Sequence, residues 1–190
     1  MKKLILLGDI GCGKSTLIRN AVGEQVSLAG GFVTRRVTED GKVLGFDLSS
    51  PRIWADPDTP ARRFLDLEQN LRDDRVFAQW GVALLENALR SPFAVADEFG
   101  GLELLIPQFR DALLTLLASD VPVIGVLKTP AAAKALAAQT GLGSAYFEAY
   151  AALHAILEAD PHTLLLPMTG WEDQHAIDTV HRWTKIHTGR

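Results

Sequence analysis

A glycine-rich segment near the start of the chain has the residue types and spacing of a phosphate-binding loop, the Walker A motif. It matches the pattern G-x-x-x-x-G-K-[ST] with Gly8, Asp9, Ile10, Gly11, Cys12, Gly13, Lys14, Ser15 and Thr16. Glycines in such a loop let backbone N–H groups approach phosphate oxygens closely. The pattern predicts that Lys14 reaches the β and γ phosphates of a nucleotide and that the Ser15 hydroxyl ligates Mg²⁺.

The flanking residues supply the elements that such a loop needs. An apolar run at residues 4–7 predicts a strand buried on both faces, and residues 14–22 predict a helix whose positive N-terminal end points at the same anion. This strand–loop–helix context disfavours a chance glycine-rich turn. Cys12 is either a redox switch or a small buried space-filler, and the absence of a second cysteine favours the space-filler.

A second apolar run, residues 93–98, ends in the two carboxylates Asp97 and Glu98. Beside a phosphate loop, Asp97 is expected to hold the Mg²⁺ shell from a neighbouring strand, and Glu98 to accept a proton from an attacking water. Without that loop, the pair would read as a solvated acidic strand end. Glu103 follows closely, either as a site residue or as an acid at a helix N-terminus.

A hairpin lies between these two motifs. Residues 30–37 and 43–48 predict its strands, and the Asp-Gly pair within residues 39–42 predicts its turn. Arg35 and Arg36 either help neutralise phosphate charge or lie on a solvated sheet face, and the solvated face is favoured.

The remaining elements complete an α/β fold. Helices are expected at residues 73–90, 105–118, 131–139, 144–159 and 171–187, and strands at residues 121–127 and 163–166. Alternating strands and helices predict a central, mostly parallel sheet with helices on both faces, a hairpin inserted at about 31–49, and one nucleotide-binding domain over residues 1–190. Lys128 and Thr129 follow a predicted strand, where one of them either senses the γ-phosphate or simply begins a loop.

Composition excludes several other classes of protein. The 190 residues carry a net charge of −4, which argues against a broad nucleic-acid surface. One cysteine excludes a disulfide framework and zinc sites built on cysteine pairs, and the five histidines lack the spacing of a metal site. Apolar runs are too short to cross a membrane, so a cytoplasmic protein is expected.

Taken together, the motifs resemble the thermophile-type nucleoside-triphosphatase family, which is similar in architecture to RecA-like P-loop ATPases with a catalytic glutamate. The resemblance covers residues 1–127 and is carried by the phosphate loop, by Gly31-Phe32-Val33-Thr34, and by the segment from Asp97 to Leu104 that reads DEFGGLEL. It implies slow hydrolysis of ATP, GTP and other triphosphates with little base preference.

Carried over to this sequence, the resemblance implies specific roles for the matching residues. Asp97 becomes the acid associated with Mg²⁺ and Glu98 the base that activates water. The phosphate and magnesium contacts become Gly8, Gly11, Gly13, Lys14, Ser15 and Thr16. Residues 128–190 do not match the family, and this C-terminal third is expected to be specialised.

The main reading is therefore Mg²⁺-dependent hydrolysis of the β–γ bond of a nucleoside triphosphate. The first alternative is a small-molecule kinase with lid arginines, for which the candidates are Arg62, Arg63, Arg72 and Arg75. A water-activating Glu98 argues against a transferase. The second alternative is a nucleotide-dependent switch or chaperone-like module that acts on an unidentified protein. A Ras-like switch is disfavoured because the chain contains no Asn-Lys-x-Asp segment.

Overall fold

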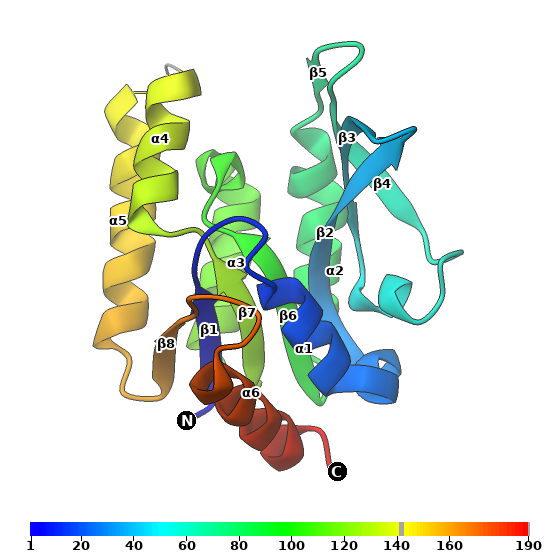
Figure 1. Ribbon diagram of the computed structural model, residues 1–190. Helices are drawn as coiled ribbons and strands as arrows, with labels where there is room; N and C mark the ends of the chain where they lie inside the picture. Colours follow the sequence, from blue (N-terminus) through cyan, green and yellow to red (C-terminus); the bar gives the residue numbers. More distant parts are fainter. Residues whose placement is uncertain (141–142, 190) are drawn as a thin grey trace.

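A twisted eight-stranded sheet forms the centre of the molecule in the computed structural model, which describes residues 1–140 and 143–189 (Figure 1). The strand order is β5-β4-β3-β2-β6-β7-β1-β8. The strands are β1 (Lys3–Leu7), β2 (Ala29–Glu39), β3 (Lys42–Ser49), β4 (Ala61–Asp66), β5 (Leu71–Arg72), β6 (Phe93–Phe99), β7 (Val123–Leu127) and β8 (Thr163–Pro167). The predicted α/β fold with a central, mostly parallel sheet is confirmed.

Five neighbouring strands, β2-β6-β7-β1-β8, pair in parallel. Their carboxyl ends therefore meet at one edge of the sheet, where ligands of open α/β folds bind. The side chains of β1 alternate between two cores: Ile5 packs into one cluster, and Leu4 and Leu6 pack into the other. All three are fully buried, as expected for a strand covered on both faces.

Helices cover both faces of the sheet (Figure 1). The α-helices are α1 (Lys14–Val22), α2 (Val82–Ala88), α3 (Pro107–Ala118), α4 (Pro130–Thr140), α5 (Gly143–Ala159) and α6 (Gln174–His187). Helices α1 and α6 pack on one face, whereas α2, α3 and the α4–α5 pair contribute to the core on the other. Among the described residues, no helix is both long and apolar enough to cross a membrane.

The sheet continues beyond its parallel part as an antiparallel extension. The predicted hairpin corresponds to β2 and β3, and its turn has positive φ values at Asp40 and Gly41. Strands β4 and β5 were not predicted, because the run from Ala61 to Asp66 carries three charged residues and lacks a clean apolar alternation. Phe64 of β4 nevertheless packs on Phe77, with ring centroids 4.8 Å apart.

Two helix boundaries differ from the sequence-based prediction. The helix expected at 73–90 begins with a π-helical segment, Val76–Gly81, which leads into α2. The helix expected at 171–187 begins only at Gln174, because the Asp173 side chain accepts a hydrogen bond from the backbone N–H of Ala176 and caps it. Trp171 therefore lies in the loop before α6 and not in the helix.

Candidate active site

The phosphate loop connects β1 to α1 and holds Lys14 across its own backbone. The Lys14 ammonium donates hydrogen bonds to the carbonyl oxygens of Gly8 at 2.9 Å and Asp9 at 2.7 Å. Gly13 precedes α1 in the left-handed conformation, with φ 98°, and as the N-cap residue it makes no side-chain hydrogen bond to the first turn of the helix. The first N–H groups of α1 are thus open toward the loop, where the helix dipole favours an anion.

A cavity of about 240 Å³ opens above this loop. Its loop-side wall consists of Gly8, Ile10, Gly11, Gly13, Lys14, Ser15 and Thr16, and its other wall of Arg36, Glu98, Val126, Lys128, Thr129 and Ala132. Two residues of the predicted phosphate loop, Asp9 and Cys12, are not among the described residues that line the cavity. The Cys12 sulfur lies instead 3.7 Å from the Met168 carbonyl oxygen.

Asp97 lies directly behind Ser15 although 82 positions separate them in the chain. The Ser15 hydroxyl donates a 2.8 Å hydrogen bond to Asp97 Oδ1. Asp97 is only 3% exposed, and this burial raises its pKa to about 6, against the opposing effect of the Ser15 hydrogen bond. Ser15 lines the cavity and Asp97 lies behind it. A hydroxyl beside a carboxylate fits Mg²⁺, which takes one or two protein oxygens and completes its octahedron with water and phosphate.

Glu98 projects into the cavity beside this pair. The Asp97–Glu98 peptide bond is cis. Glu98 Oε1 accepts a 2.5 Å hydrogen bond from the ammonium of Lys128, and both side chains are about one-third exposed or less. Lys128 follows β7, the strand between β1 and β6, so it lies between the phosphate loop and the acids. The Thr129 hydroxyl is occupied in the first turn of α4, where it accepts from the N–H of Ala132.

The two neighbouring arginines of β2 have different surroundings. Arg36 lines the cavity, with its guanidinium 5.9 Å from the ring centroid of Phe46. Arg35 forms an ion pair with Asp47 at 3.2 Å and does not line the cavity. Successive side chains of a strand point to opposite faces, so only one of the pair can face the loop. Both side chains are exposed, as a solvated sheet face predicts, and Arg36 in addition lines the cavity.

A second cavity, of about 290 Å³, adjoins the first and shares Glu98 and Lys128 with it. Its remaining wall is mostly apolar and includes Phe46, Phe64, Phe77, Leu65, Leu102 and Leu136. Glu103 also lines this cavity, where its carboxylate accepts a 2.7 Å hydrogen bond from the N–H of Gly101, and its burial raises its pKa. Glu103 is thus not part of the phosphate cavity.

The four candidate lid arginines lie at different places in the structure. Arg72 lines the second cavity. Arg62 and Arg75 line a different cavity beside Trp80, and Arg63 is bonded to Asp47 at 2.5 Å. These four side chains do not converge on the phosphate loop.

The segment that follows β8 carries no sequence motif that predicts its position. This segment runs alongside the phosphate loop, because the Met168 N–H donates a 2.7 Å hydrogen bond to the Leu7 carbonyl. The contact is close: a Cβ atom on Gly8 would lie 2.4 Å from the Met168 carbonyl oxygen. Gly8 is therefore required by packing as well as by the loop conformation.

A strand–loop–helix unit with a lysine across the loop, facing paired acids at the end of a parallel strand, defines a P-loop nucleotide-binding protein. A model of the NTPase family matches residues 3–143 of this chain. The chain therefore belongs to this NTPase family, which confirms the resemblance and the expectation of a nucleoside-triphosphatase.

Relatives and solved structures agree with this assignment. The nucleoside-triphosphatase THEP1 of Thermotoga petrophila is 34% identical over 132 residues, which are 66% of this chain and 72% of that protein. The THEP1 of Methanosarcina acetivorans is 29% identical over 137 residues, which are 67% of this chain and 76% of that protein.

Two solved structures share the fold across nearly the whole chain. The crystal structure of THEP1 from Aquifex aeolicus gives a TM-score of 0.63 at 18% identity and covers 94% of this chain and 96% of its own. The solution structure of a human cancer-related nucleoside triphosphatase gives 0.62 at 19% identity and covers 100% of both chains. The fold likeness thus extends into residues 144–190, beyond the family match.

Proposed function

We propose that this protein hydrolyses the β–γ phosphoanhydride bond of nucleoside triphosphates in a Mg²⁺-dependent reaction with little base preference, and that residues 1–190 form one nucleotide-binding unit. The observation that carries the proposal is the single cavity walled by the phosphate loop on one side and by Glu98 on the other. The cytoplasmic location expected from the single cysteine stays a prediction.

Binding relies on the loop. The backbone N–H groups from Gly11 to Ser15 and the N-terminal end of α1 would surround the β and γ phosphates. In the free protein the Lys14 ammonium donates hydrogen bonds to two neutral carbonyl groups of the loop. A bound phosphate would replace them with a charged acceptor, which forms a stronger hydrogen bond. Thr16, which lines the cavity one residue beyond Ser15, is available to the α-phosphate.

The metal would be held by Ser15 and Asp97. A Mg²⁺ ion held by these two residues would neutralise part of the phosphate charge. Asp97 is buried with a raised pKa in the free protein, so a cation at this position would stabilise its ionised form. The Ser15–Asp97 hydrogen bond holds the two oxygens next to each other before any nucleotide arrives.

Glu98 acts on water. Its carboxylate orients the attacking water and accepts a proton as the new bond to the γ phosphorus forms and the bond to the β–γ bridging oxygen breaks. The products are a nucleoside diphosphate and orthophosphate. In the free protein Glu98 is bound by Lys128, and the γ-phosphate competes for the same ammonium. When the Lys128 ammonium bonds to the phosphate, Glu98 becomes free to bind water. Arg36, on the same wall of the cavity, adds a positive charge that would stabilise the developing negative charge of the phosphate.

A phosphate-release assay tests this function. With Mg²⁺ we expect orthophosphate from ATP, GTP, CTP and UTP at rates within about tenfold of one another, because the bond cleaved is the same in all four. EDTA should stop release, and each orthophosphate should be matched by one nucleoside diphosphate. Pyrophosphate with a monophosphate would contradict the β–γ assignment, and no product from any triphosphate would refute the function.

A second candidate, phosphoryl transfer to a small molecule, is favoured by one observation. The second cavity adjoins Glu98 and is large enough for a small acceptor. Here Glu98 would take the proton of an acceptor hydroxyl in place of water. Incubation of γ-labelled ATP with a cell metabolite extract distinguishes the two: label in an organic phosphate supports transfer, and label only in orthophosphate supports hydrolysis.

A further inference from the structure

We infer that Trp171 stacks on the nucleobase of the bound triphosphate, an inference that rests on the proposed function and names the residue behind its broad base preference. Trp171 lies in the loop between β8 and α6, outside both cavities described above. Three features of this loop carry the inference. It lies close to the phosphate loop, hydrogen bonds hold it in place, and it lies on the other side of β1 from Glu98 and Lys128.

The contact is with the last glycine of the phosphate loop. A Cβ atom on Gly13 would lie 3.5 Å from the Cβ of Trp171 and 3.6 Å from the Cε of Met168. In Figure 1 the loop between β8 and α6 crosses beside the phosphate loop and the start of α1. Trp171 thus lies so close to Gly13 that an added Cβ atom would be in van der Waals contact with it.

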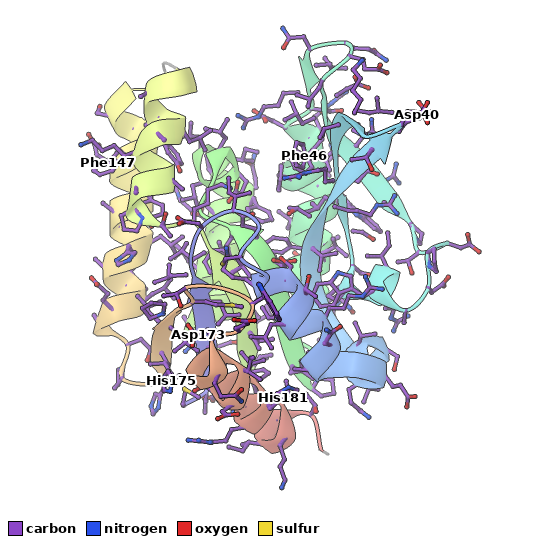
Figure 2. All side chains as sticks on the ribbon, viewed as in Figure 1. Asp40, Phe46, Phe147, Asp173, His175 and His181 are labelled. Carbon is purple, nitrogen blue, oxygen red and sulfur yellow. The ribbon has the colours of Figure 1, made fainter. Side chains whose placement is uncertain are left out.

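The indole is exposed although the loop that carries it is held in place. Trp171 is 75% exposed, whereas Trp183 is fully buried and Trp54 and Trp80 are half-buried. Asp173, labelled in Figure 2 at the start of α6, accepts hydrogen bonds from the N–H groups of Ala176 and Thr169 and from the Thr169 hydroxyl. A large aromatic ring is therefore presented to water from an ordered loop that contacts the phosphate loop.

The strand order decides which end of the nucleotide meets this ring. Glu98 lies near the end of β6 and Lys128 follows β7, whereas the Trp171 loop follows β8, on the other side of β1. The γ-phosphate must point toward Glu98 for hydrolysis. The nucleoside then leaves the phosphate loop away from β6 and β7, toward the side where Trp171 lies.

This contact explains why the base would matter little. Every nucleobase has a π-face, so an aromatic platform binds all of them with similar strength. The polar groups of Asp173 and Thr169 in this loop bond to one another or to the backbone, and so they are not free to read a base edge. A stacked indole contributes about 10- to 100-fold in affinity for any base.

The test compares ligands with and without a base. Calorimetry would measure binding of ATP, GTP, CTP, UTP and inorganic tripolyphosphate, each with Mg²⁺, to the parent, Trp171→Ala and Trp171→Phe. Trp171→Ala should weaken all four nucleotides by about 10- to 100-fold and leave tripolyphosphate unchanged, whereas Trp171→Phe should restore most of the affinity. Phe147→Ala, at an exposed aromatic on α5, should change none of these (Figure 2).

Other results overturn the inference. Unchanged nucleotide affinity in Trp171→Ala would show that the ring makes no contact, and equal weakening of tripolyphosphate would show that it only supports the loop. A parent that binds ATP no more tightly than tripolyphosphate would show that the base has no subsite. A parent that prefers ATP through Trp171 yet releases no phosphate would refute the proposed hydrolysis while the stacking stands.

Discussion

The two walls of the phosphate cavity differ in whether backbone groups or side chains form them. The loop wall consists largely of backbone, shaped by glycines and a helix end, and its one charged side chain is bonded to loop carbonyls. The opposite wall consists of side chains from separate segments of the chain, among them Glu98, Lys128 and Arg36. The backbone donors are held by the fold of the loop, whereas Glu98 and Lys128 are joined by an ion pair whose members could bond to other groups. We therefore propose that the loop wall binds the nucleotide and the opposite wall performs the chemistry.

The largest effect is expected on the loop wall. Lys14→Ala removes the ammonium that meets the β and γ phosphates, so affinity for Mg²⁺–ATP should fall about 1,000-fold. Calorimetry measures this, with Lys134→Ala on the exposed side of α4 as the control. If Lys14→Ala bound ATP as tightly as the parent, the phosphates would not lie on this loop.

A smaller effect, on turnover, separates the two arginines of β2. Arg36→Ala should lower kcat by about 100-fold, because a cation facing developing phosphate charge is lost. Arg35→Ala loses only a half-exposed ion pair with Asp47 and should stay within about threefold of the parent kcat. Steady-state kinetics of both variants give the comparison. Equal losses from the two would mean that facing the cavity is not what matters.

The smallest effect is on stability and concerns Asp97. Above about pH 4 its carboxyl is ionised in the unfolded chain, whereas the folded protein retains the proton up to about pH 6. The folded state therefore binds more protons in this window and loses stability as the pH rises. In metal-free buffer at pH 7, Asp97→Asn should gain about 2 kcal/mol in free energy of unfolding over the parent.

Urea titrations from pH 4 to pH 8 measure this difference. It should be near zero at pH 4 and reach its full size above pH 6. Glu103 also has a raised pKa, and it contributes equally to both proteins, so the comparison isolates Asp97. A variant less stable than the parent at pH 7 would mean that the Ser15 hydrogen bond outweighs the burial of charge.

The sequence was most informative where a short pattern fixes a local geometry. The run from Gly8 to Thr16 predicts the strand, loop and helix together, because its glycines and its Lys-Ser-Thr end are the residue types that a phosphate loop between a strand and a helix requires. The Asp40–Gly41 turn likewise identifies its hairpin. Family membership extends these predictions over residues 3–143.

Contacts between distant segments were harder to predict. The Lys128–Glu98 ion pair depends on β7 lying between β1 and β6, an order that no local pattern encodes. The different roles of Arg35 and Arg36 depend on which face of β2 meets the cavity. Trp171 was placed inside a helix because its spacing fits the apolar period of α6, and only the Asp173 cap excludes it.

The most direct test of the division between the two walls is Glu98→Gln. The amide keeps the size of the side chain but cannot accept the proton of water. Affinity for Mg²⁺–ATP should stay within about threefold of the parent, while phosphate release should fall at least about 100-fold. Glu86→Gln, at an exposed position of α2, should match the parent in both measurements. Phosphate release by Glu98→Gln at the parent rate would contradict the assignment of the chemistry to this wall.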